Sequence, residues 1–353
     1  MNILAINPGS TSTKIAVYTN NELFEETIVH DREELNQFKE IYQQKDFRFN
    51  CVTSVLKEKG WDSIQFAAVV GRGGMIKPVE GGVYEVNLPM LEDLKTGVSG
   101  IHASNLGGVI ANMFSGQYGV KSFIVDPVVI DEMKAVAKFS GVKGIERKSL
   151  FHALNQKAVA RDIAESLGKN YDELNLIVAH LGGGISVGAH QNGKVIDVNN
   201  ALSGDGPFSP ERAGGLPVDG LSKYLKQNDC GPEELISLVS RSGGVYSYLG
   251  IVEVRDLETM HRDGNKEATA VLEAMIYQIV KEIGALSAVL KGKVDGIILT
   301  GGIAYSQLVT DQITDNVKFI STVYKKPGGM EMQALVNGAK RVLEGTEKVK
   351  EYS

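Results

Sequence analysis

The chain has 353 residues, of which 43% are hydrophobic and 23% are charged, and its 37 basic and 43 acidic residues give a formal net charge of −6. The length predicts about two domains of ordinary soluble globular composition. The negative net charge argues against binding to nucleic acid or to an anionic membrane, and no apolar run approaches the ~18 residues of a membrane-spanning helix. The N-terminal residues MNILAINPGS are too short and uncharged for a signal peptide, so we expect none. Cys51 and Cys230 form no metal-binding spacing and fit two reduced thiols, so we expect a cytoplasmic protein.

Hydrophobic patterns predict the following elements in chain order. Strands are expected at Ile3–Ile6, Lys14–Tyr18, Leu23–Val29, Ile64–Val70 and Lys121–Val125, and a helix is expected to start at Asp131 and Glu132. A helix is expected at Leu154–Leu167, strands at Leu176–Ala179 and Lys194–Val198, and the longest helix at Glu267–Leu290. The remaining elements are a strand at Val294–Leu299, a helical segment, a last strand at Lys318–Ser321 and a helix at Met330–Leu343. Strands and helices mix throughout, which indicates the α/β class.

An approximate internal repeat organises the chain. In residues 3–29 a short apolar strand meets a turn of small polar residues, and two further strands follow. Residues 176–200 show the same pattern, with a glycine-rich turn in place of the polar one and the hairpin signal Asn192-Gly193 before the third strand. The second copy begins about half the chain after the first. We therefore expect two similar domains that face each other.

Three turns at strand ends carry residues that suit phosphate binding. The first, residues 7–14, reads NPGSTSTK, where backbone N–H groups, hydroxyls and one lysine can cradle phosphate oxygens. It lacks the GxxxxGK[ST] pattern of a P-loop, and alone it also fits a polar hairpin turn. The second, residues 181–184, reads LGGG after His180, and the third is Gly301-Gly302, between a buried strand and a helix. Together the three turns predict a nucleotide site.

The segment 184–188 matches the G-x-S-x-G pattern of serine hydrolases. That pattern works in a sharp turn between a strand and a helix, which exposes the serine. Here Ser186 lies in a strand-like run that ends at the predicted hairpin, so we do not expect a serine hydrolase. Three histidines outside the motifs are interpreted as structural or surface residues: His30, His190 and His261.

The motifs in combination resemble a known family. NPGSTSTK, HLGGGISVG, LTGGIAYS and SLFHALNQKAVA look like the carboxylate kinases of the acetate and butyrate kinase family, within the sugar-kinase, heat-shock-chaperone and actin superfamily. The resemblance runs essentially end to end. It is closer to butyrate and branched-chain fatty-acid kinases, because GRGG, GIHASNLGG and the length fit them, whereas acetate kinases are longer and have Cys where Pro8 stands.

The resemblance implies an α/β fold of two ribonuclease-H-like (actin-like ATPase) domains with the active-site cleft between them. We place the N-terminal domain at residues 1–150 plus 332–353. The C-terminal domain, at residues 151–331, would carry the adenosine loop.

The same resemblance assigns site residues position by position. It implies phosphate contacts from Asn7, Ser10, Ser12 and Lys14 in the first turn, from His180, Gly182 and Gly184 in the second, and an adenosine loop at Gly301, Gly302 and Ile303. It implies Mg²⁺ near Asn7, Asp126 and Glu331, with catalytic roles for His102, His152, Arg72, Arg212 and Asp126. It implies an apolar acid pocket near Ile101, Phe151, Phe208 and Pro210. Acetate kinases have Asn where Gly183 stands, so any contact from that side chain is absent here.

The implied activity is reversible transfer of the γ-phosphate of ATP to butyrate or a related short or branched fatty acid, giving ADP and an acyl phosphate. A carboxylate is already an anion near neutral pH, so it needs no general base, and arginines and histidines supply the charge stabilisation of in-line transfer. The family implies at least a homodimer. Three alternatives stay open: an acetate or propionate kinase, an ATP-driven switch protein of the actin or chaperone type, and a sugar or polyol kinase, which would need an aspartate base.

Overall fold

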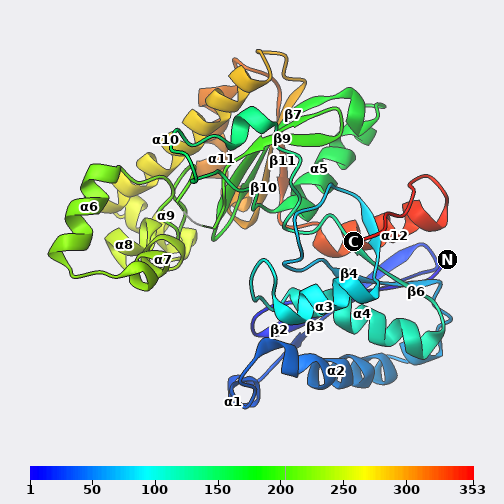
Figure 1. Cartoon of the computed structure of the whole chain (residues 1–353). Helices are drawn as coiled ribbons and strands as arrows, with labels where there is room; N and C mark the ends of the chain where they lie inside the picture. Colours follow the sequence, from blue (N-terminus) through cyan, green and yellow to red (C-terminus); the bar gives the residue numbers. More distant parts are fainter. Residues whose placement is uncertain (203) are drawn as a thin grey trace. The chain divides into compact units, whose positions relative to one another are not determined.

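A computed structural model describes residues 1–202 and 204–353, and the chain separates into two compact units (Figure 1). The first unit comprises Met1–Ile130 and Met330–Ser353, and the second comprises Asp131–Gly329. Each unit is built on one sheet with helices packed against it, which confirms the α/β class. No helix within the described ranges is long and apolar enough to cross a membrane.

The first unit contains a six-stranded sheet in the order β3-β2-β1-β4-β6-β5. Its strands are β1 (Ile3–Pro8), β2 (Ser12–Thr19), β3 (Glu22–Val29), β4 (Ala68–Arg72), β5 (Val83–Glu85) and β6 (Lys121–Val125). The first three strands form an antiparallel meander, β1, β4 and β6 are parallel, and β5 runs antiparallel to β6. Its helices are α1 (Arg32–Asn36), α2 (Lys45–Glu58), α3 (Leu88–Thr96), α4 (Asn105–Tyr118) and α12 (Glu331–Leu343).

Two helices cover opposite faces of this sheet. Gly108 of α4 lies against Ile124 of β6, whereas Gly338 of α12 lies against the neighbouring residue Val125. Successive strand residues point to opposite faces, so α4 and α12 enclose the sheet between them. α2 packs beside α4, in the apolar cluster around Phe114.

The second unit contains a five-stranded sheet in the order β11-β10-β7-β8-β9. Its strands are β7 (Asn175–Leu181), β8 (Ile185–Gln191), β9 (Lys194–Val198), β10 (Gly296–Gly301) and β11 (Val323–Pro327). β7, β8 and β9 form an antiparallel meander, and β7, β10 and β11 are parallel. Its helices are α5 (Ala153–Ser166), α6 (Val218–Gln227), α7 (Pro232–Ser240), α8 (Gly244–Leu249), α9 (Val254–Arg262), α10 (Lys266–Val289) and α11 (Gln307–Val317).

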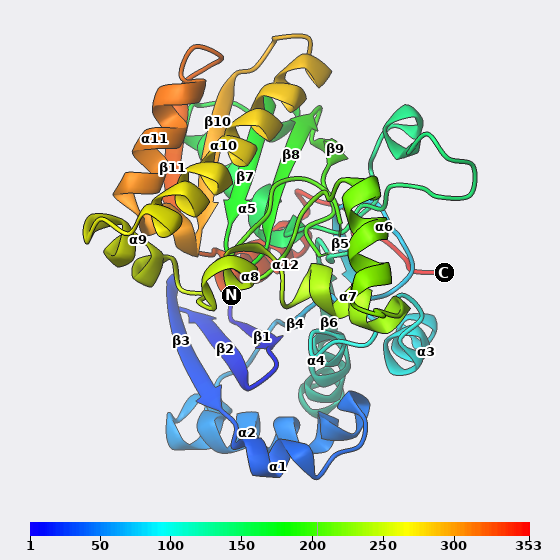
Figure 2. The same ribbon diagram turned by 90° about the vertical axis from the view of Figure 1, so that its left-hand side faces the viewer.

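The long helix α10 runs across one face of this second sheet, with α11 beside it (Figure 2). Ile177 and Ala179 of β7 belong to the apolar cluster under these helices, together with Met275 and Ile279 of α10. α5 packs against β7 and β10. Asn155 of α5 hydrogen-bonds to His180 of β7 and Thr300 of β10. These two side chains alternate along their strands with the apolar ones under α10, so α5 covers the other face of the sheet.

The two sheets share one topology. In each, an antiparallel three-stranded meander is continued from its first strand by two parallel strands: β1 by β4 and β6, and β7 by β10 and β11. This order confirms the internal repeat that the sequence indicates. The predicted strands and helices of both copies are present, with ends shifted by up to four residues, as at β4.

Two predicted elements are wrong. The last strand is Val323–Pro327 instead of Lys318–Ser321, because α11 continues to Val317 and the N–H of Ile320 still closes its end by donating to the carbonyl of Val317. No helix starts at Asp131 and Glu132, since residues 131–134 have no regular secondary structure and only a short 3-10 helix, Ala135–Lys138, follows them.

The unit boundaries also differ from those placed by sequence. Residues 131–150 group with the second unit, because the N–H of Lys134 donates to the carbonyl of Ile196 and Arg147 pairs with Asp197. The chain returns to the first unit at Met330, two residues before the expected position.

Candidate active site

The first phosphate turn joins β1 to β2. The N–H of Gly9 donates to the carbonyl of Ser12 at 2.7 Å, which closes a tight turn that leaves Ser10 and Thr11 exposed. Lys14 pairs in register with Asn7 and is also exposed. The turn therefore presents hydroxyls, N–H groups and a positive charge at one end of the sheet, the combination that suits phosphate oxygens.

Three predicted residues meet at the ends of the adjacent parallel strands β1, β4 and β6. Arg72 ends β4 and donates from Nη1 to Oδ1 of Asn7 at 3.3 Å, and Asp126 directly follows β6. The carboxyl ends of parallel strands are the usual place for a ligand in an open α/β sheet. Burial lowers the pKa of Arg72 and the charge of Glu331, at the start of α12, opposes that effect, so Glu331 lies near this group.

The buried residue Asp126 adopts an unusual backbone conformation. Its φ of 38° lies in the left-handed region, which is costly for a residue other than glycine and typical of functional sites. Its Oδ1 accepts the N–H of Gly82 at 2.8 Å.

The chemistry of Asn7 and Asp126 fits a magnesium ion. Within the described ranges no cluster of three or more histidine, cysteine, aspartate or glutamate side chains forms a closed metal cage. Mg²⁺ in kinases uses one or two carboxylates and fills its other positions with phosphate oxygens and water. One carboxylate and one amide oxygen near a phosphate turn therefore suit Mg²⁺ better than a metal with an all-protein site.

His102 precedes α4, and its tautomer is defined by its neighbour. The backbone N–H of Ser104 donates to Nδ1 at 3.1 Å, so Nδ1 is the acceptor and Nε2 carries the proton. The adjacent Ile101 is 72% exposed, so within its own unit it lines no enclosed pocket.

In the second unit, His152 and His180 stack face to face, with ring centroids 3.8 Å apart and an interplanar angle of 9°. His152 immediately precedes α5 and His180 lies near the end of β7. Two cationic rings would repel each other at this distance, so the stack requires that at least one imidazole be neutral.

A buried amide defines the tautomer of His180. Thr300 donates its hydroxyl proton to the carbonyl of Gly328 at 3.1 Å, so its oxygen accepts from Nδ2 of Asn155, also at 3.1 Å. The same amide nitrogen lies 2.8 Å from Nδ1 of His180 and donates to it. The proton of neutral His180 therefore sits on Nε2.

Ser186 fixes His152 in a similar way. Its fully buried hydroxyl accepts from Nε2 of Gln156 at 2.8 Å and lies 2.9 Å from Nδ1 of His152. The same oxygen also accepts the backbone N–H of His152 at 3.5 Å, so both of its lone pairs are used and its proton is directed to Nδ1, which places the imidazole proton on Nε2. Oε1 of Gln156 continues the network to the buried His190 at 3.0 Å, so this histidine is structural, as the sequence suggested.

Ser186 lies in β8, with no helix after it. This geometry confirms that the G-x-S-x-G match is not a hydrolase elbow.

Arg212 lies over the glycine turn that follows β7. A Cβ atom on Gly184 would overlap the guanidinium, so the absence of a side chain there makes room for it. Its Nη1 donates to the carbonyl of Ala201, while Nε is buried and has no hydrogen-bond partner among the described residues. Burial lowers the pKa of Arg212 and the charge of Glu211 opposes this effect. A buried cationic donor without a partner is suited to an anionic ligand.

The third glycine turn is shaped by Gly301. Its φ of 88° is left-handed, and a Cβ atom would overlap the backbone of Leu181. Its N–H donates to the carbonyl of Gly328 at 3.0 Å. Gly302 opens onto free space and Ile303 is buried, so the turn offers exposed backbone above an apolar floor.

The apolar residues expected to hold the acid are divided between the two units. Phe151, Phe208 and Pro210 are buried in the second unit, whereas Ile101 belongs to the first. Ser209 ties its segment to the glycine turn, because its hydroxyl donates to the carbonyl of Gly183 at 2.6 Å.

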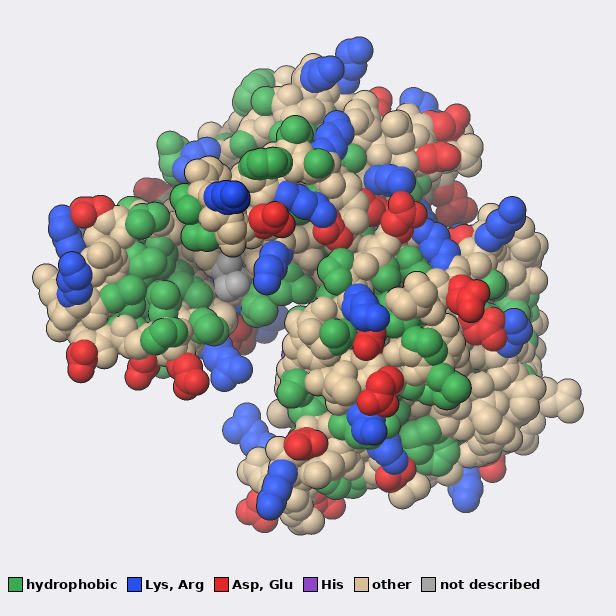
Figure 3. Space-filling view, viewed as in Figure 1, with side chains coloured by type: hydrophobic (Ala, Val, Ile, Leu, Met, Phe, Trp, Pro, Cys, Tyr) green, Lys and Arg blue, Asp and Glu red, His purple; other side chains and the backbone are tan. Residues whose placement is uncertain are grey.

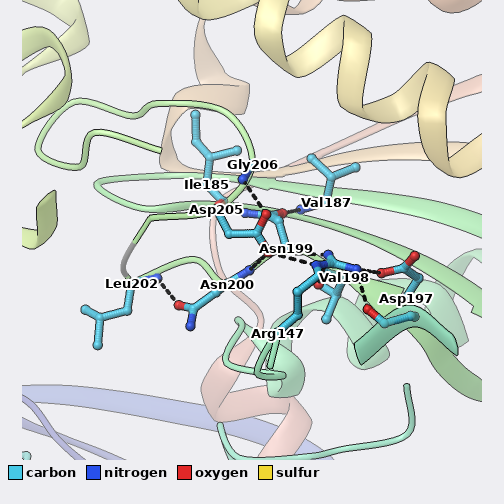
Figure 4. A network of polar contacts seen from close by, with 11 residues as sticks. Arg147, Ile185, Val187, Asp197, Val198, Asn199, Asn200, Leu202, Asp205 and Gly206 are labelled. Carbon is cyan, nitrogen blue, oxygen red and sulfur yellow. Dashed lines mark hydrogen bonds and ion pairs between the residues drawn. The ribbon is translucent and has the colours of Figure 1, made fainter. Parts of the chain in front are cut away.

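A polar network that the sequence did not reveal supports this segment (Figure 4). Asn199, the residue after β9, accepts the N–H of Val187 at 2.7 Å and donates to the carbonyl of Ile185 at 3.0 Å. These two hydrogen bonds fix the segment that follows β9 to the neighbouring strand β8. Arg147 binds carboxylates on both sides of Asn199, Asp197 at 2.9 Å and Asp205 at 3.3 Å. The network anchors the chain just before Phe208 and Arg212. No motif marks it, because its members come from two strands and from separate loops.

The chain resembles known kinases over its whole length. The model of the acetokinase family matches residues 116–336. A probable butyrate kinase from Clostridium botulinum (strain Alaska E43 / Type E3) is 53% identical over 351 residues, covering 99% of both chains. Among solved structures, Porphyromonas gingivalis acetate kinase gives a TM-score of 0.78 at 19% identity, covering 96% of this chain and 99% of its own. A Francisella tularensis propionate kinase gives 0.71 at 17% identity, covering 95% and 98%.

The chain therefore belongs to the acetokinase family. The solved structures are too dissimilar in sequence to indicate more than the fold, and they confirm the actin-like ATPase architecture in two halves. Membership of this family favours a carboxylate kinase over the switch-protein and sugar-kinase alternatives.

Proposed function

We propose that the protein transfers the γ-phosphate of ATP to butyrate or a related short or branched-chain fatty acid and catalyses the reverse reaction. The full-length similarity to a probable butyrate kinase carries this proposal. The proposed phosphate turns support it, as does the buried Nε of Arg212, which has no partner in the part of the chain that the structure describes, because phosphoryl transfer uses such groups.

In the proposed reaction a carboxylate oxygen attacks the γ-phosphorus as the bond to the ADP oxygen breaks in line. The carboxylate brings its own negative charge, so no residue has to remove a proton. Arg72, Arg212 and the Nε2–H groups of His152 and His180 would stabilise the charge on the equatorial oxygens. The proposal requires residues of both units to act on one ATP and one acid during turnover, as the family cleft implies.

The remaining site residues would bind the nucleotide. Asn7, Asp126 and Glu331 would hold Mg²⁺, which neutralises phosphate charge when bound. Phosphate oxygens would lie on the first two turns, through Ser10, Ser12, Lys14, Gly182 and Gly184. The third turn, at Gly301, Gly302 and Ile303, would hold adenosine. His102 would present its Nε2–H to the acid or to the transferred phosphoryl group.

The proposed acid is a four- or five-carbon one, held by Phe151, Phe208, Pro210 and Ile101. One methylene in an apolar pocket changes binding by only about 1–3 kcal/mol, so neighbouring acids should compete. Trapping of acyl phosphate by hydroxylamine, with Mg-ATP and single acids from acetate to valerate and their branched isomers, tests the proposal. Most product with four- or five-carbon acids would support it, whereas most product with acetate or propionate, or none with any acid, would contradict it.

We also propose that the protein forms at least a homodimer and acts in the cytoplasm. Hydrophobic side chains gather over the helices α6–α8, and the exposed ones include Val218, Ile236 and Tyr248 (Figure 3). Apolar surface of this kind marks an interaction site, and a second copy of the chain is the partner we propose. The two cysteines are free, as in a reducing compartment. Light scattering after gel filtration tests the oligomer, and a mass of one chain would refute it.

A further inference from the structure

A fully buried arginine lies behind the first phosphate turn. Arg48, on α2, donates from Nη1 to the carbonyl oxygens of Gly9 and Ser12, both at 2.9 Å, and from Nη2 to that of Ser10 at 3.1 Å. Gln44 fixes the guanidinium, because its Oε1 accepts from Nε at 3.1 Å and from Nη2 at 3.0 Å. Three carbonyl groups of the turn therefore point inward, toward one cation.

The remaining carbonyl of the turn also points inward. The oxygen of Thr11 accepts the backbone N–H of His30 at 2.9 Å. The hydroxyl of Thr13 accepts from Arg48 Nη1 at 3.1 Å and forms a second hydrogen bond with Nε2 of His30 at 2.8 Å. Burial, with a smaller contribution from the Arg48 charge, lowers the pKa of His30 to about 4, so the ring is neutral at pH 7 and adds no second cation beside Arg48.

Inward carbonyls force N–H groups outward. In a trans peptide the C=O of one residue and the N–H of the next point in opposite directions. The inward carbonyls of Gly9 and Ser10 therefore turn the N–H groups of Ser10 and Thr11 to the outside. Both residues are exposed, and in the ranges that the structure describes neither N–H donates to a protein group. Successive outward N–H groups form a concave site for an anion.

We propose that Arg48 is a positioning residue for phosphate binding, which holds the first turn with its N–H groups facing the phosphate oxygens of the nucleotide. The acceptors of its guanidinium among the described residues are carbonyl, amide and hydroxyl oxygens, so its charge is not neutralised by a carboxylate there. That charge also favours an anion on the outer side of the turn, since the protein between them screens weakly. The inference rests on the proposed phosphoryl transfer.

The test compares Arg48→Met, which keeps the bulk and removes the donors and the charge, with Arg48→Lys, which keeps the charge and part of the donors. Displacement of a reactant by about 1 Å can cost about 10²-fold in rate. We expect Arg48→Met to lower kcat/KM for Mg-ATP by about 10²-fold, with little change in KM for the acid, and Arg48→Lys to recover about tenfold of that loss. The control is Leu56→Ala, a buried residue of α2 that lies outside the turn.

The control separates a positioning role from a merely structural one. If Arg48 positions the turn, Leu56→Ala should lower the melting temperature as much as Arg48→Met does, yet keep kcat/KM within about twofold of the wild type. Equal losses in Leu56→Ala and Arg48→Met, or a folded Arg48→Met enzyme with wild-type kinetics, would overturn the proposal. If Arg48→Met does not fold, Gln44→Ala tests the same idea, because it keeps the arginine and removes its anchor. That variant should lose at least threefold in kcat/KM for Mg-ATP, and an unchanged value would overturn the proposal.

Binding of Mg-ADP, measured by calorimetry without any acid, separates this inference from the proposed reaction. A wild-type protein that binds Mg-ADP but makes no acyl phosphate would refute the reaction alone. Weaker binding of Mg-ADP by Arg48→Met, by at least tenfold, would then still support the role of Arg48, and unchanged binding would overturn it.

Discussion

Substitution of Ser186 by alanine isolates the positioning of His152 from its chemistry. The variant removes the buried hydroxyl that lies 2.9 Å from Nδ1 of His152 and 2.8 Å from Nε2 of Gln156. Gln156 keeps a second acceptor, the carbonyl of residue 186 at 3.0 Å, and the backbone N–H of His152 loses only a long contact of 3.5 Å. The loss of stability should therefore be about 1–2 kcal/mol, the net value of one or two hydrogen bonds.

The expected loss of activity follows from the same hydrogen bond. Without the serine proton at Nδ1, the His152 ring can rotate or exchange tautomers, and its Nε2–H no longer faces the phosphoryl group in every molecule. The net contribution of one hydrogen bond, about 1.4 kcal/mol, corresponds to a tenfold decrease in kcat. His152→Ala, which removes the donor itself, should cost about 10²–10³-fold.

Hydroxylamine trapping at saturating Mg-ATP and acid measures these losses, and the double variant provides the decisive comparison. Once His152 is alanine, the serine has nothing to position, so the double variant should be no slower than His152→Ala. Ser122→Ala, at a buried serine of β6, is the matched control and should keep kcat within about twofold. Wild-type kcat in Ser186→Ala, or losses that multiply in the double variant, would refute the reasoning.

Three further predictions concern pH, the glycine turn and a buried ion pair. The pKa of His30 is lowered from 6.5 to about 4, so the free energy of unfolding should fall by up to about 3 kcal/mol as pH drops through this window, and urea unfolding of His30→Gln should show a flatter pH dependence. Gly184→Ala should lower kcat at least tenfold and also lower the melting temperature, because the methyl group would displace Arg212 and crowd the carbonyl of Ala201; wild-type kcat would contradict this. Lys157→Met should lower the free energy of unfolding in urea by about 3–5 kcal/mol, because it removes the ammonium group that lies 2.9 Å from the buried carboxylate of Glu132. Adding Glu132→Gln should restore most of that free energy.

The sequence predicted the elements whose residues alternate or repeat clearly. The meander strands and α10 have strong apolar patterns, and the structure confirms them within a few residues. Helix α2 was not predicted, because its buried face carries Arg48 besides Val52 and Leu56. A charged residue in a helix suggests a solvent-facing position, and only the fold shows that this one has the carbonyls of a turn as partners.

The candidate site was predicted from local motifs, and the groups that hold it were not. Asn7, Arg72 and Asp126 sit at strand ends, and the family resemblance identified them there. By contrast, Ser186 looked like a hydrolase decoy and Asn155 received no role within its motif SLFHALNQKAVA, yet these residues set the tautomers of His152 and His180. Such partners are distant in sequence, so hydrogen-bond geometry is needed to find them.

The two phosphate turns occupy equivalent places in the repeat but owe their shapes to different causes. The first carries side chains, and its backbone is oriented from behind by Arg48. The second has almost no side chains, and it is bound from the front, by Ser209 on the carbonyl of Gly183 and by Arg212 over Gly184. The backbone orientation of the first turn should therefore depend on a residue that no ligand touches. The second turn should be sensitive to any added side chain, because the space that a Cβ atom would fill is occupied by Arg212, for which we propose a catalytic role.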